Sequence, residues 1–314
     1  MEVAEERFLG QFANATKALT TWLNDKETLE IMCNEGDIFV DMLGKEIEKA
    51  PVFLSDVDTL RIISLVASHS QTTITSDNPI VSAELPDGSR FEGLISPVVK
   101  KPSFSIRKHL SKVLTLDNYV ESGIIDEKTK EIIEDSIRER HNVVVVGSTG
   151  SGKTTFCNAI VDGIARLTPA HRVISIEDTR ELKINSEDSL CLRTSDTVDM
   201  TRLLKSCMRL RPDRILVGEV RDASALALLK AWNTGHPGGV ATVHANSALS
   251  GLIRLEQLVQ EANIPLAVVK PLIAEAVNVV IFMEKTKTSR KVKEIIKVTG
   301  FDSKNFEYTY DKIL

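Results

Sequence analysis

Short apolar runs alternate with longer amphipathic segments over the second half of this sequence, which is the pattern of a parallel β-sheet with helices on its faces. The predicted strands cover residues 143–146, 173–176, 190–193, 215–218 and 239–243, and the predicted helices cover residues 126–140, 155–165, 200–208, 223–232, 248–261 and 266–277. Residues 279–283, 292–298 and 306–310 predict antiparallel strands at the edge of the sheet. The fold class expected for residues 125–314 is therefore α/β.

The first part of the chain has a mixed pattern that predicts a smaller α+β domain over residues 1–112. Apolar residues recur near the helical period from Phe8 to Leu23, so we expect an amphipathic helix over residues 3–23. Its apolar stripe would face the core or a docking surface, with a membrane anchor as the alternative. The other predicted elements are strands at residues 29–33, 38–43, 81–85, 90–95 and 104–107, and a helix at 57–68 capped by Asp56 or Asp58. Residues 113–124 lack a clear period and are expected to link the two domains.

Composition restricts the kinds of function. The 314 residues are enough for two domains, and the formal net charge of −5 argues against a general nucleic-acid-binding protein, so direct nucleic-acid binding is not expected. The four cysteines form no C-x-x-C pair and suggest neither a zinc site nor a disulfide framework, which fits a reducing cytosol. The acidic N-terminus predicts no signal peptide, and no run reaches the ~18 apolar residues of a spanning helix. Any membrane association would be peripheral.

Residues 147–154, Gly-Ser-Thr-Gly-Ser-Gly-Lys-Thr, match the P-loop pattern G-x-x-x-x-G-K-[ST] between a predicted strand and a predicted helix. The glycines let successive backbone N–H groups surround nucleotide phosphates, and the helix start adds its own N–H groups. Lys153 is expected to bridge the β- and γ-phosphates, and the Thr154 hydroxyl to join the shell of a Mg²⁺ ion. The predicted nucleotide-binding residues are Gly147, Ser148, Thr149, Gly150, Ser151, Gly152, Lys153, Thr154 and Thr155.

Hydrolysis also requires a group that orients water, and two acidic stretches follow predicted strands. In residues 176–182, Ile-Glu-Asp-Thr-Arg-Glu-Leu, Glu177 would orient water or hold Mg²⁺, although such a loop is often a solvated turn. In residues 209–222, Glu219 follows a buried strand where P-loop enzymes carry the Walker-B carboxylate, and it would act as the base. The alternative for Glu219 is a surface carboxylate paired with Arg221. The predicted metal-binding residues are Thr154, Glu177 and Glu219.

Two histidines occur in the glycine-rich stretch of residues 234–246, Thr-Gly-His-Pro-Gly-Gly-Val-Ala-Thr-Val-His-Ala-Asn. His244 ends a predicted strand and is expected to sense the γ-phosphate, or to link it to the neighbouring helix, through a hydrogen bond that changes on hydrolysis. His236 has either a functional role or a structural role in the turn. The candidate catalytic residues of this half of the chain are thus Lys153, Glu177, Glu219 and His244.

These four stretches, in this order, resemble the secretion ATPases, the hexameric traffic ATPases of type II and type IV secretion, pilus assembly and conjugation. Met208 departs from the family signature, which generally has leucine there. Residues 29–41, 81–94 and 116–120 are most similar to conjugal transfer ATPases of the TrbB type, relatives of the VirB-type secretion ATPase. The resemblance therefore covers nearly the whole chain.

The resemblance implies a RecA-like ATPase domain that hydrolyses ATP with Mg²⁺, in a homo-hexameric ring at the cytoplasmic face of the inner membrane. The implied partners are other secretion ATPases and the coupling protein of a conjugative type IV apparatus. In that family the N-terminal domain supplies arginines to the nucleotide, and Arg90 and Arg107 match those positions; the alternative is that both are strand-surface charges. Residues 116–119 match a segment that contacts adenine, and the sequence has no N-K-x-D motif that would select guanine.

Two other functions remain open. One is a pilus extension or retraction motor of the same superfamily. The other is a nucleotide-dependent assembly scaffold or switch with slow hydrolysis, which the retention of Glu177, Glu219 and His244 disfavours.

Overall fold

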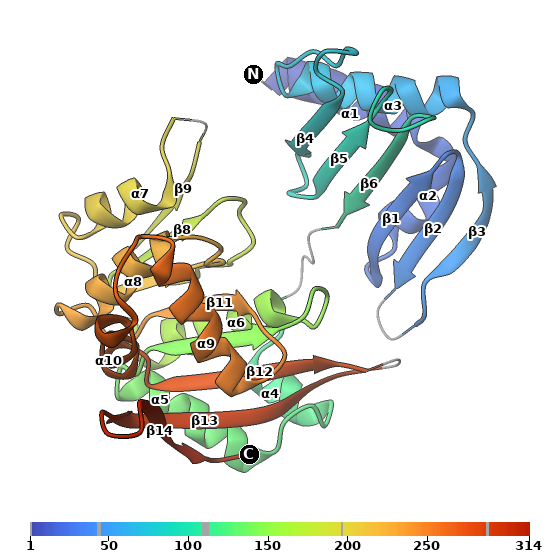
Figure 1. Ribbon diagram of the computed structural model, residues 1–314. Helices are drawn as coiled ribbons and strands as arrows, with labels where there is room; N and C mark the ends of the chain where they lie inside the picture. Colours follow the sequence, from blue (N-terminus) through green and yellow to red (C-terminus); the bar gives the residue numbers. More distant parts are fainter. Residues whose placement is uncertain (1, 43–44, 109–112, 196, 287–288) are drawn as a thin grey trace. The chain divides into compact units, whose positions relative to one another are not determined.

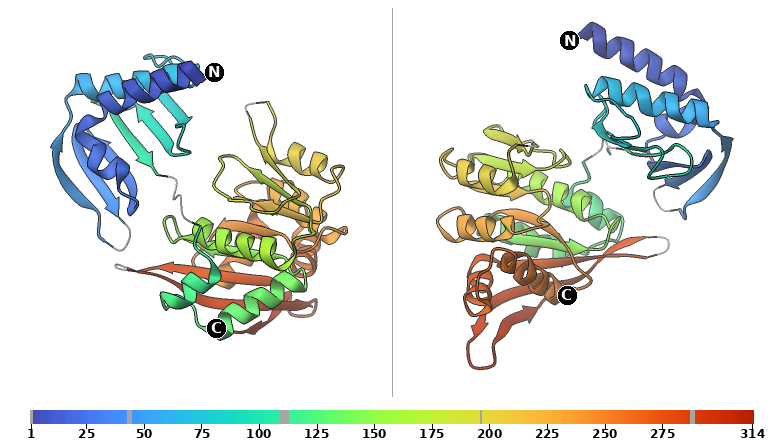
Figure 2. Two further views of the ribbon diagram at one scale, coloured as in Figure 1. Left: turned by 180° about the vertical axis from the view of Figure 1, so that it is seen from behind. Right: turned by 45° about the horizontal axis from the view of Figure 1, so that its top comes forward.

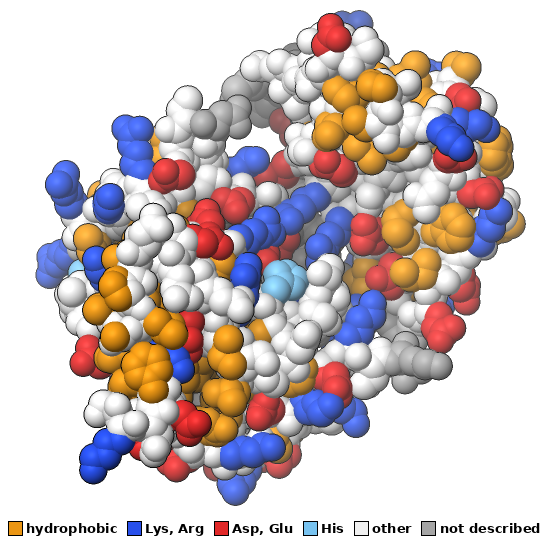
Figure 3. Space-filling view, viewed as in Figure 1, with side chains coloured by type: hydrophobic (Ala, Val, Ile, Leu, Met, Phe, Trp, Pro, Cys, Tyr) orange, Lys and Arg blue, Asp and Glu red, His pale blue; other side chains and the backbone are white. Residues whose placement is uncertain are grey.

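The computed structural model describes residues 2–42, 45–108, 113–195, 197–286 and 289–314, and the chain forms two compact units, Met1–Lys112 and Val113–Leu314 (Figures 1 and 2). Each unit has its own sheet, and the first unit has one hydrophobic core whereas the second has one on each face of its sheet. The mixed α/β fold class predicted from the sequence is confirmed. On the face that Figure 3 shows, acidic and basic side chains of the described residues are interspersed.

The first unit is an antiparallel sheet covered by helices on one face. Its strand order is β3-β2-β1-β6-β5-β4, and α1 (Glu2–Ala15) lies beside α3 (Asp56–His69), where the rings of Phe8 and His69 stack with centroids 4.0 Å apart. Ile31 and Ile106, opposite each other on neighbouring strands, are fully buried. The strands are Thr28–Asn34 (β1), Asp37–Met42 (β2), Glu48–Phe53 (β3), Ile80–Glu84 (β4), Arg90–Leu94 (β5) and Ser103–Arg107 (β6).

The helix predicted over residues 3–23 is interrupted. After α1, the hydroxyl of Thr16 donates to the carbonyl oxygen of Phe12 at 2.7 Å, and a 3₁₀ turn, Lys17–Leu19, precedes α2 (Thr20–Asn24). The turn buries Leu19 completely. The interruption therefore changes the direction of the chain and keeps Leu19 in the core.

Two further details of this unit differ from expectation. β3 was not predicted because it contains Pro51, and it lies at the edge of the sheet, where a missing backbone N–H is tolerated. α3 begins at Asp56, but its N-cap is Ser55, whose hydroxyl accepts a hydrogen bond from the backbone N–H of Asp58.

The second unit is built on a sheet with the strand order β14-β13-β12-β7-β11-β10-β8-β9. The strands from β12 to β9 in this order are parallel, and β13 and β14 extend the sheet as antiparallel strands. The strands are Val143–Gly147 (β7), Val173–Glu177 (β8), Ser189–Arg193 (β9), Arg214–Val217 (β10), Val240–His244 (β11), Val279–Lys285 (β12), Arg290–Asp302 (β13) and Glu307–Lys312 (β14). The prediction that residues 279–283 form an antiparallel edge strand is wrong: β12 follows a crossover helix and pairs with β7 in parallel.

Helices cover both faces of this sheet (Figure 2), and the valines of β7 show how the sequence fixes the two faces. Val143 and Val145 pack in the core that contains α4, α5 and α6, whereas Val144 and Val146 pack in the core that contains α7 to α10. The helices are Leu116–Glu121 (α4), Glu127–Arg138 (α5), Lys153–Leu167 (α6), Met200–Cys207 (α7), Ser224–Asn233 (α8), Ala248–Gln260 (α9) and Leu266–Ala276 (α10). Because these strands are buried on both faces, their residues form continuous apolar runs in the sequence.

The predicted linker of residues 113–124 contains α4, and these residues belong to the second unit. α4 opens with a capping box, in which the side chains of Thr115 and Asn118 each accept a hydrogen bond from the other's backbone N–H. Leu116 and Tyr119 are buried, and the ring of Tyr119 meets Phe156 of α6 edge-on at 5.0 Å. Of the four residues that the resemblance assigned to adenine, Leu116 and Tyr119 are therefore core residues in this structure, whereas Asp117 is exposed and Asn118 is partly buried.

Candidate active site

The P-loop connects β7 to α6 in a conformation that depends on its glycines. Gly150 and Gly152 have φ angles of 71° and 89°, in the left-handed region that favours glycine. A Cβ atom on Gly147 would lie 2.5 Å from the carbonyl oxygen of Met283, so the backbone passes too close to β12 for a side chain. The hydroxyl of Ser151 is buried and has no hydrogen-bond partner among the described residues. The loop thus has the tight turn before a helix that anion binding requires.

Lys153 is the first residue of α6, and its side chain folds back into the P-loop. Its Nζ donates to the carbonyl oxygens of Gly147 and Ser148 at 2.9 and 3.0 Å and lies 3.3 Å from Nδ1 of His244. Lys153 is 7 % exposed, so its ammonium group lies inside the curve of the loop. Thr154 and Thr155, the next residues of α6, are partly buried at the helix start.

β11 and β10 bring the histidine and the Walker-B glutamate to the P-loop. His244 pairs in register with Gly147 on the neighbouring strand β7, and Glu219 follows β10, the next strand. Nε2 of His244 lies 2.9 Å from Oε1 of Glu219, and Nη2 of Arg221 lies 2.6 Å from Oε2 of the same carboxylate. The structure therefore connects Lys153, His244 and Glu219 in one chain of contacts. It also contains the pairing with Arg221 that was the alternative for Glu219.

Neighbouring charges keep Glu219 ionised. Burial opposes the charged form, but the hydrogen bond and charge of Arg221, together with His244 and Lys153, outweigh burial and lower the pKa of Glu219. The hydrogen bond with Glu219 in turn raises the pKa of Arg221. Glu219 is thus a carboxylate able to accept a proton, held between two donors.

A family model for the type II/IV secretion system protein matches residues 17–305. The chain belongs to this family. It is 46 % identical over 293 residues to the probable conjugal transfer protein TrbB of Sinorhizobium fredii, an alignment that covers 93 % of this chain and 89 % of the relative. The predicted resemblance to TrbB-type proteins is thereby confirmed.

Two solved structures of ATPases share the fold. The VirB11 ATPase from the Brucella suis type IV secretion system, crystallised with sulphate, has a TM-score of 0.51 and 24 % identity, covering 95 % of this chain and 97 % of that chain. The ATPase DotB of Yersinia pseudotuberculosis has a TM-score of 0.66 and 20 % identity, covering 90 % of this chain and 78 % of that chain. At these identities the likeness concerns the fold alone.

In this family member, Glu177 holds the acidic loop that follows β8. Its Oε1 accepts hydrogen bonds from the backbone N–H groups of Glu181 and Leu182, both at 2.9 Å, and the residue is 2 % exposed. Gly218 packs directly against it, because a Cβ atom there would lie 2.9 Å from Cγ and Oε1 of Glu177. The carboxylate lies beside the strand end that carries Glu219 and is directed toward the backbone of its own loop.

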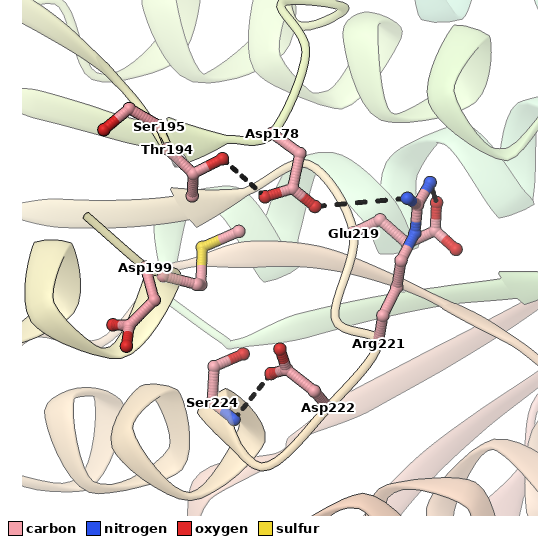
Figure 4. A pocket seen from close by; sticks show the side chains of 9 residues that line it. Asp178, Thr194, Ser195, Asp199, Glu219, Arg221, Asp222 and Ser224 are labelled. Atoms are coloured by element: carbon pink, nitrogen blue, oxygen red, sulfur yellow. Dashed lines mark hydrogen bonds and ion pairs between the residues drawn. The ribbon is translucent and has the colours of Figure 1, made fainter. Parts of the chain in front are cut away.

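An open cavity of about 230 Å³ lies next to Glu219 (Figure 4). Its lining includes Asp178, Asp199, Asp222 and Arg221. Nη1 of Arg221 lies 4.0 Å from Oδ2 of Asp178, on the opposite side of the guanidinium from Glu219. The cavity therefore adds a second carboxylate within reach of the arginine that holds Glu219.

The two candidate histidines of the secretion signature lie at opposite ends of β11. His244 ends the strand at the P-loop, whereas His236 lies in the bend before it, with Nδ1 3.2 Å from the carbonyl oxygen of Ala231. The structure does not bring His236 to the site. Near the same bend lies Arg214, which the sequence did not single out and which donates to the carbonyl oxygens of Gly238 and Ile137 at 2.9 and 2.7 Å.

Arg214 is a buried charge satisfied by protein carbonyl groups. It is 1 % exposed, and its Nε donates to Nδ1 of His171 at 3.0 Å. Burial, with a smaller contribution from the charge of Arg140, lowers the pKa of Arg214 to about 10. Because it joins α5 to the bend before β11, Arg214 fixes the end of the sheet that is remote from Glu219.

Arg90 and Arg107 lie in the first unit, where they are opposite each other on β5 and β6. Directly opposed residues share one face of the sheet, so the structure brings these two predicted arginines together.

Among the described residues, no helix combines the length and apolar character needed to cross a bilayer.

Arg290, at the start of β13, is a P-loop neighbour that sequence reasoning missed. Its Nε donates to the carbonyl oxygen of Gly150 at 3.0 Å, and its Cδ lies 3.0 Å from where a Cβ atom on Gly152 would be. No motif marks this position, because contact with the P-loop depends on how the hairpin of β12 and β13 folds over it.

Proposed function

We propose that this protein hydrolyses ATP to ADP and phosphate at the P-loop of its second unit and uses the cycle to power a conjugative type IV secretion apparatus or its pilus assembly. The observation that carries the proposal is the convergence of Lys153, His244 and Glu219 at the ends of three neighbouring parallel strands. Ligand sites of open α/β sheets form at these carboxyl ends. Membership of the family and the kinship with conjugal transfer protein TrbB supply the biological setting.

Each residue has a role that follows from its position. The P-loop N–H groups and the Lys153 ammonium bind the phosphate oxygens, in the place where the ammonium now contacts loop carbonyl groups. Glu219 accepts a proton from the attacking water. The water oxygen bonds to the γ-phosphorus while the bond between the γ-phosphorus and the β,γ-bridging oxygen breaks. His244 links Glu219 to Lys153 and so connects the base with the phosphate site.

The residues at the P-loop fit a magnesium ion held mainly by phosphate. The described residues contain no group of three His, Cys, Asp or Glu side chains suited to a metal, so the ion would take most of its ligands from phosphate and water. Thr154 would contribute its hydroxyl oxygen. We assign Glu177 to support of its loop because its Oε1 already accepts two backbone N–H groups, and we keep Glu219 as the base because its two oxygens already contact His244 and Arg221. When bound, Mg²⁺ would neutralise charge that develops on the phosphate oxygens.

The larger assembly also belongs to the proposal. A homo-hexameric ring at the cytoplasmic face of the inner membrane, with Arg90 and Arg107 contributing charge to the nucleotide, would couple hydrolysis to partner secretion ATPases and a coupling protein. In this proposal, contact with the membrane would be peripheral.

The deciding experiment measures Mg²⁺-dependent phosphate release over a series of protein concentrations for wild type, Lys153→Ala and Glu219→Gln. We expect activity to rise cooperatively with protein concentration and to fall by at least about a hundredfold in both variants. Size-exclusion chromatography with light scattering on the same samples measures the molar mass and hence the number of subunits in the ring. Phosphate release by Glu219→Gln at the wild-type rate would exclude the assigned base.

A second candidate is an assembly switch with slow hydrolysis, and one observation favours it: each carboxylate oxygen of Glu219 has a protein partner. Under this alternative, Glu219→Gln would keep its role in assembly. Conjugation frequency in cells that carry this variant separates the two, because a motor loses transfer and a switch retains it.

A further inference from the structure

We infer that Arg221 restrains the base Glu219 and that hydrolysis begins when Arg221 transfers its ion pair to Asp178. This inference rests on the proposed ATPase function and specifies how its base is regulated. The three residues lie at one side of the cavity shown in Figure 4.

The first step is the occupation of Glu219. Its Oε1 is 2.9 Å from Nε2 of His244 and its Oε2 is 2.6 Å from Nη2 of Arg221. A general base must direct a lone pair at the proton that it removes. A charge-assisted hydrogen bond from a guanidinium occupies a lone pair of the carboxylate and makes the carboxylate a weaker base. Glu219 in this arrangement is oriented but restrained.

The second step is the alternative partner. Nη1 of Arg221 is 4.0 Å from Oδ2 of Asp178, while Oδ1 of Asp178 accepts a hydrogen bond from Thr194 at 2.8 Å. The carboxylate of Asp178 is thus held in place and presents its other oxygen to the arginine. A shift of the guanidinium by about 1 Å would bring that pair to hydrogen-bond distance.

The third step is freedom to move. The Arg221 side chain is 55 % exposed and borders the cavity, so it can change partners without opening the core. The backbone before it is fixed, because Val220 is buried and its N–H donates to the carbonyl oxygen of Thr242 at 2.9 Å. The exchange is therefore a side-chain movement, with Glu219 left in position.

The first test is steady-state hydrolysis by Arg221→Gln and Asp178→Asn, which should change kcat in opposite directions. Removal of the restraint should raise basal kcat about three- to tenfold, and removal of the alternative partner should lower it by a similar factor, with KM within about twofold of wild type in each case. Arg202→Gln, an equal loss of charge at an exposed position of α7, should leave kcat unchanged. A purely structural role would lower kcat in both site variants.

The second test does not depend on turnover. Thermal unfolding of single and double variants is measured without nucleotide and with the non-hydrolysable analogue AMP-PNP plus Mg²⁺. Without nucleotide, Arg221→Gln and Glu219→Gln should shift the midpoint non-additively, by about 1–3 °C, whereas Arg221→Gln and Asp178→Asn should add. With AMP-PNP, the effects of Arg221→Gln and Glu219→Gln on the midpoint should add, whereas those of Arg221→Gln and Asp178→Asn should be non-additive.

The outcomes separate the inference from the function on which it rests. Wild-type hydrolysis combined with a reduced kcat in Arg221→Gln would overturn the restraint and leave the ATPase intact. Coupling of Arg221 to Glu219 that persists at saturating AMP-PNP would overturn the exchange. Wild type that neither binds AMP-PNP nor hydrolyses ATP would overturn the ATPase proposal itself, and the exchange with it.

Discussion

Nε2 of His244 lies 2.9 Å from Oε1 of Glu219, and the other ring nitrogen lies 3.3 Å from Nζ of Lys153. One tautomer satisfies both contacts: Nε2–H donates to the carboxylate, and Nδ1 accepts from the ammonium group. The imidazole thus bridges the base and the phosphate-binding lysine, and a change at either neighbour is transmitted through one ring.

His244→Leu should lower kcat about 10- to 100-fold while the affinity for nucleotide changes by less than about threefold, because the bridge is lost and the P-loop remains. Phosphate release and binding of a fluorescent ATP analogue measure the two quantities. His236→Leu is the matched control, since His236 lies at the other end of β11 and should retain the wild-type kcat. Equal losses in the two variants would contradict the assignment.

Arg290→Met should weaken nucleotide binding about three- to tenfold, because the charged hydrogen bond that holds the carbonyl group of Gly150 is lost. At saturating ATP, kcat should change less than KM. The control is Lys293→Met on the same strand, which removes a surface ion pair with Glu284, a contact that does not involve the P-loop, and it should leave binding unchanged. Titration with a fluorescent ATP analogue provides the measurement, and normal affinity in Arg290→Met would show that the loop keeps its shape without this bond.

Gly218→Ala should destabilise the second unit by about 1–3 kcal/mol, because the new methyl group would overlap Cγ and Oε1 of the buried Glu177. Gly10→Ala is the matched substitution, since no atom lies within 4 Å of its Cβ position in α1, and it should stabilise the first unit by about 1 kcal/mol.

These opposite shifts can be measured separately for each unit. The chain has two tryptophans, Trp22 in the first unit and Trp232 in the second. Urea unfolding followed by fluorescence in Trp22→Phe and Trp232→Phe backgrounds therefore reports one unit at a time. Stabilisation by Gly218→Ala would mean that Glu177 gives way easily and does not hold its loop.

Glu134→Gln should destabilise the protein by about 1 kcal/mol at pH 7, where its carboxylate joins two helices. Its oxygens accept hydrogen bonds from Arg166 of α6 at 2.6 Å and Arg138 of α5 at 3.0 Å. Burial opposes the charge of Glu134, but the two arginines outweigh burial and lower its pKa.

The pH dependence follows from that direction. A carboxyl group with a lowered folded-state pKa contributes stability above its unfolded pKa of about 4.3 and loses it as pH falls through the folded value. The difference between wild type and Glu134→Gln in urea unfolding should therefore be largest at neutral pH and shrink below about pH 4. Glu131→Gln, at an exposed position of the same helix, should show little effect at either pH.

Much of the second unit was predictable because its strands are buried on both faces. Runs such as Val143–Gly147 are apolar throughout and bounded by turn residues, which makes their limits visible in a single sequence. Strand neighbours are not visible in this way: β12 pairs in parallel with β7, and only the crossover through α10 determines that direction. β3 and α4 were missed since Pro51 masks a strand and α4 is too short for a helical period to emerge.

The site was predictable where a motif fixes a residue at the end of a strand or at the start of the helix that follows it. Such motifs singled out Lys153, Glu219 and His244, and His244 contacts both of the others, although the catalytic roles of the three residues stay predictions. His236 belongs to the same motif as His244 but precedes the strand that His244 ends. Membership of the motif therefore did not indicate which of the two histidines lies at the site. Arg290 contacts a residue 140 positions away, and no local pattern records that contact.

The register between β7 and β11 has a consequence for how this family can vary. The ladder runs without a shift from Val143 and Val240 to Gly147 and His244. Because side chains alternate along a strand, adding or deleting one residue in β11 would turn the imidazole to the opposite face of the sheet. The register of these two adjoining strands thus fixes the position of the imidazole relative to the P-loop. Evolution can therefore lengthen the surface loops of this unit more freely than it can change the number of residues in β11.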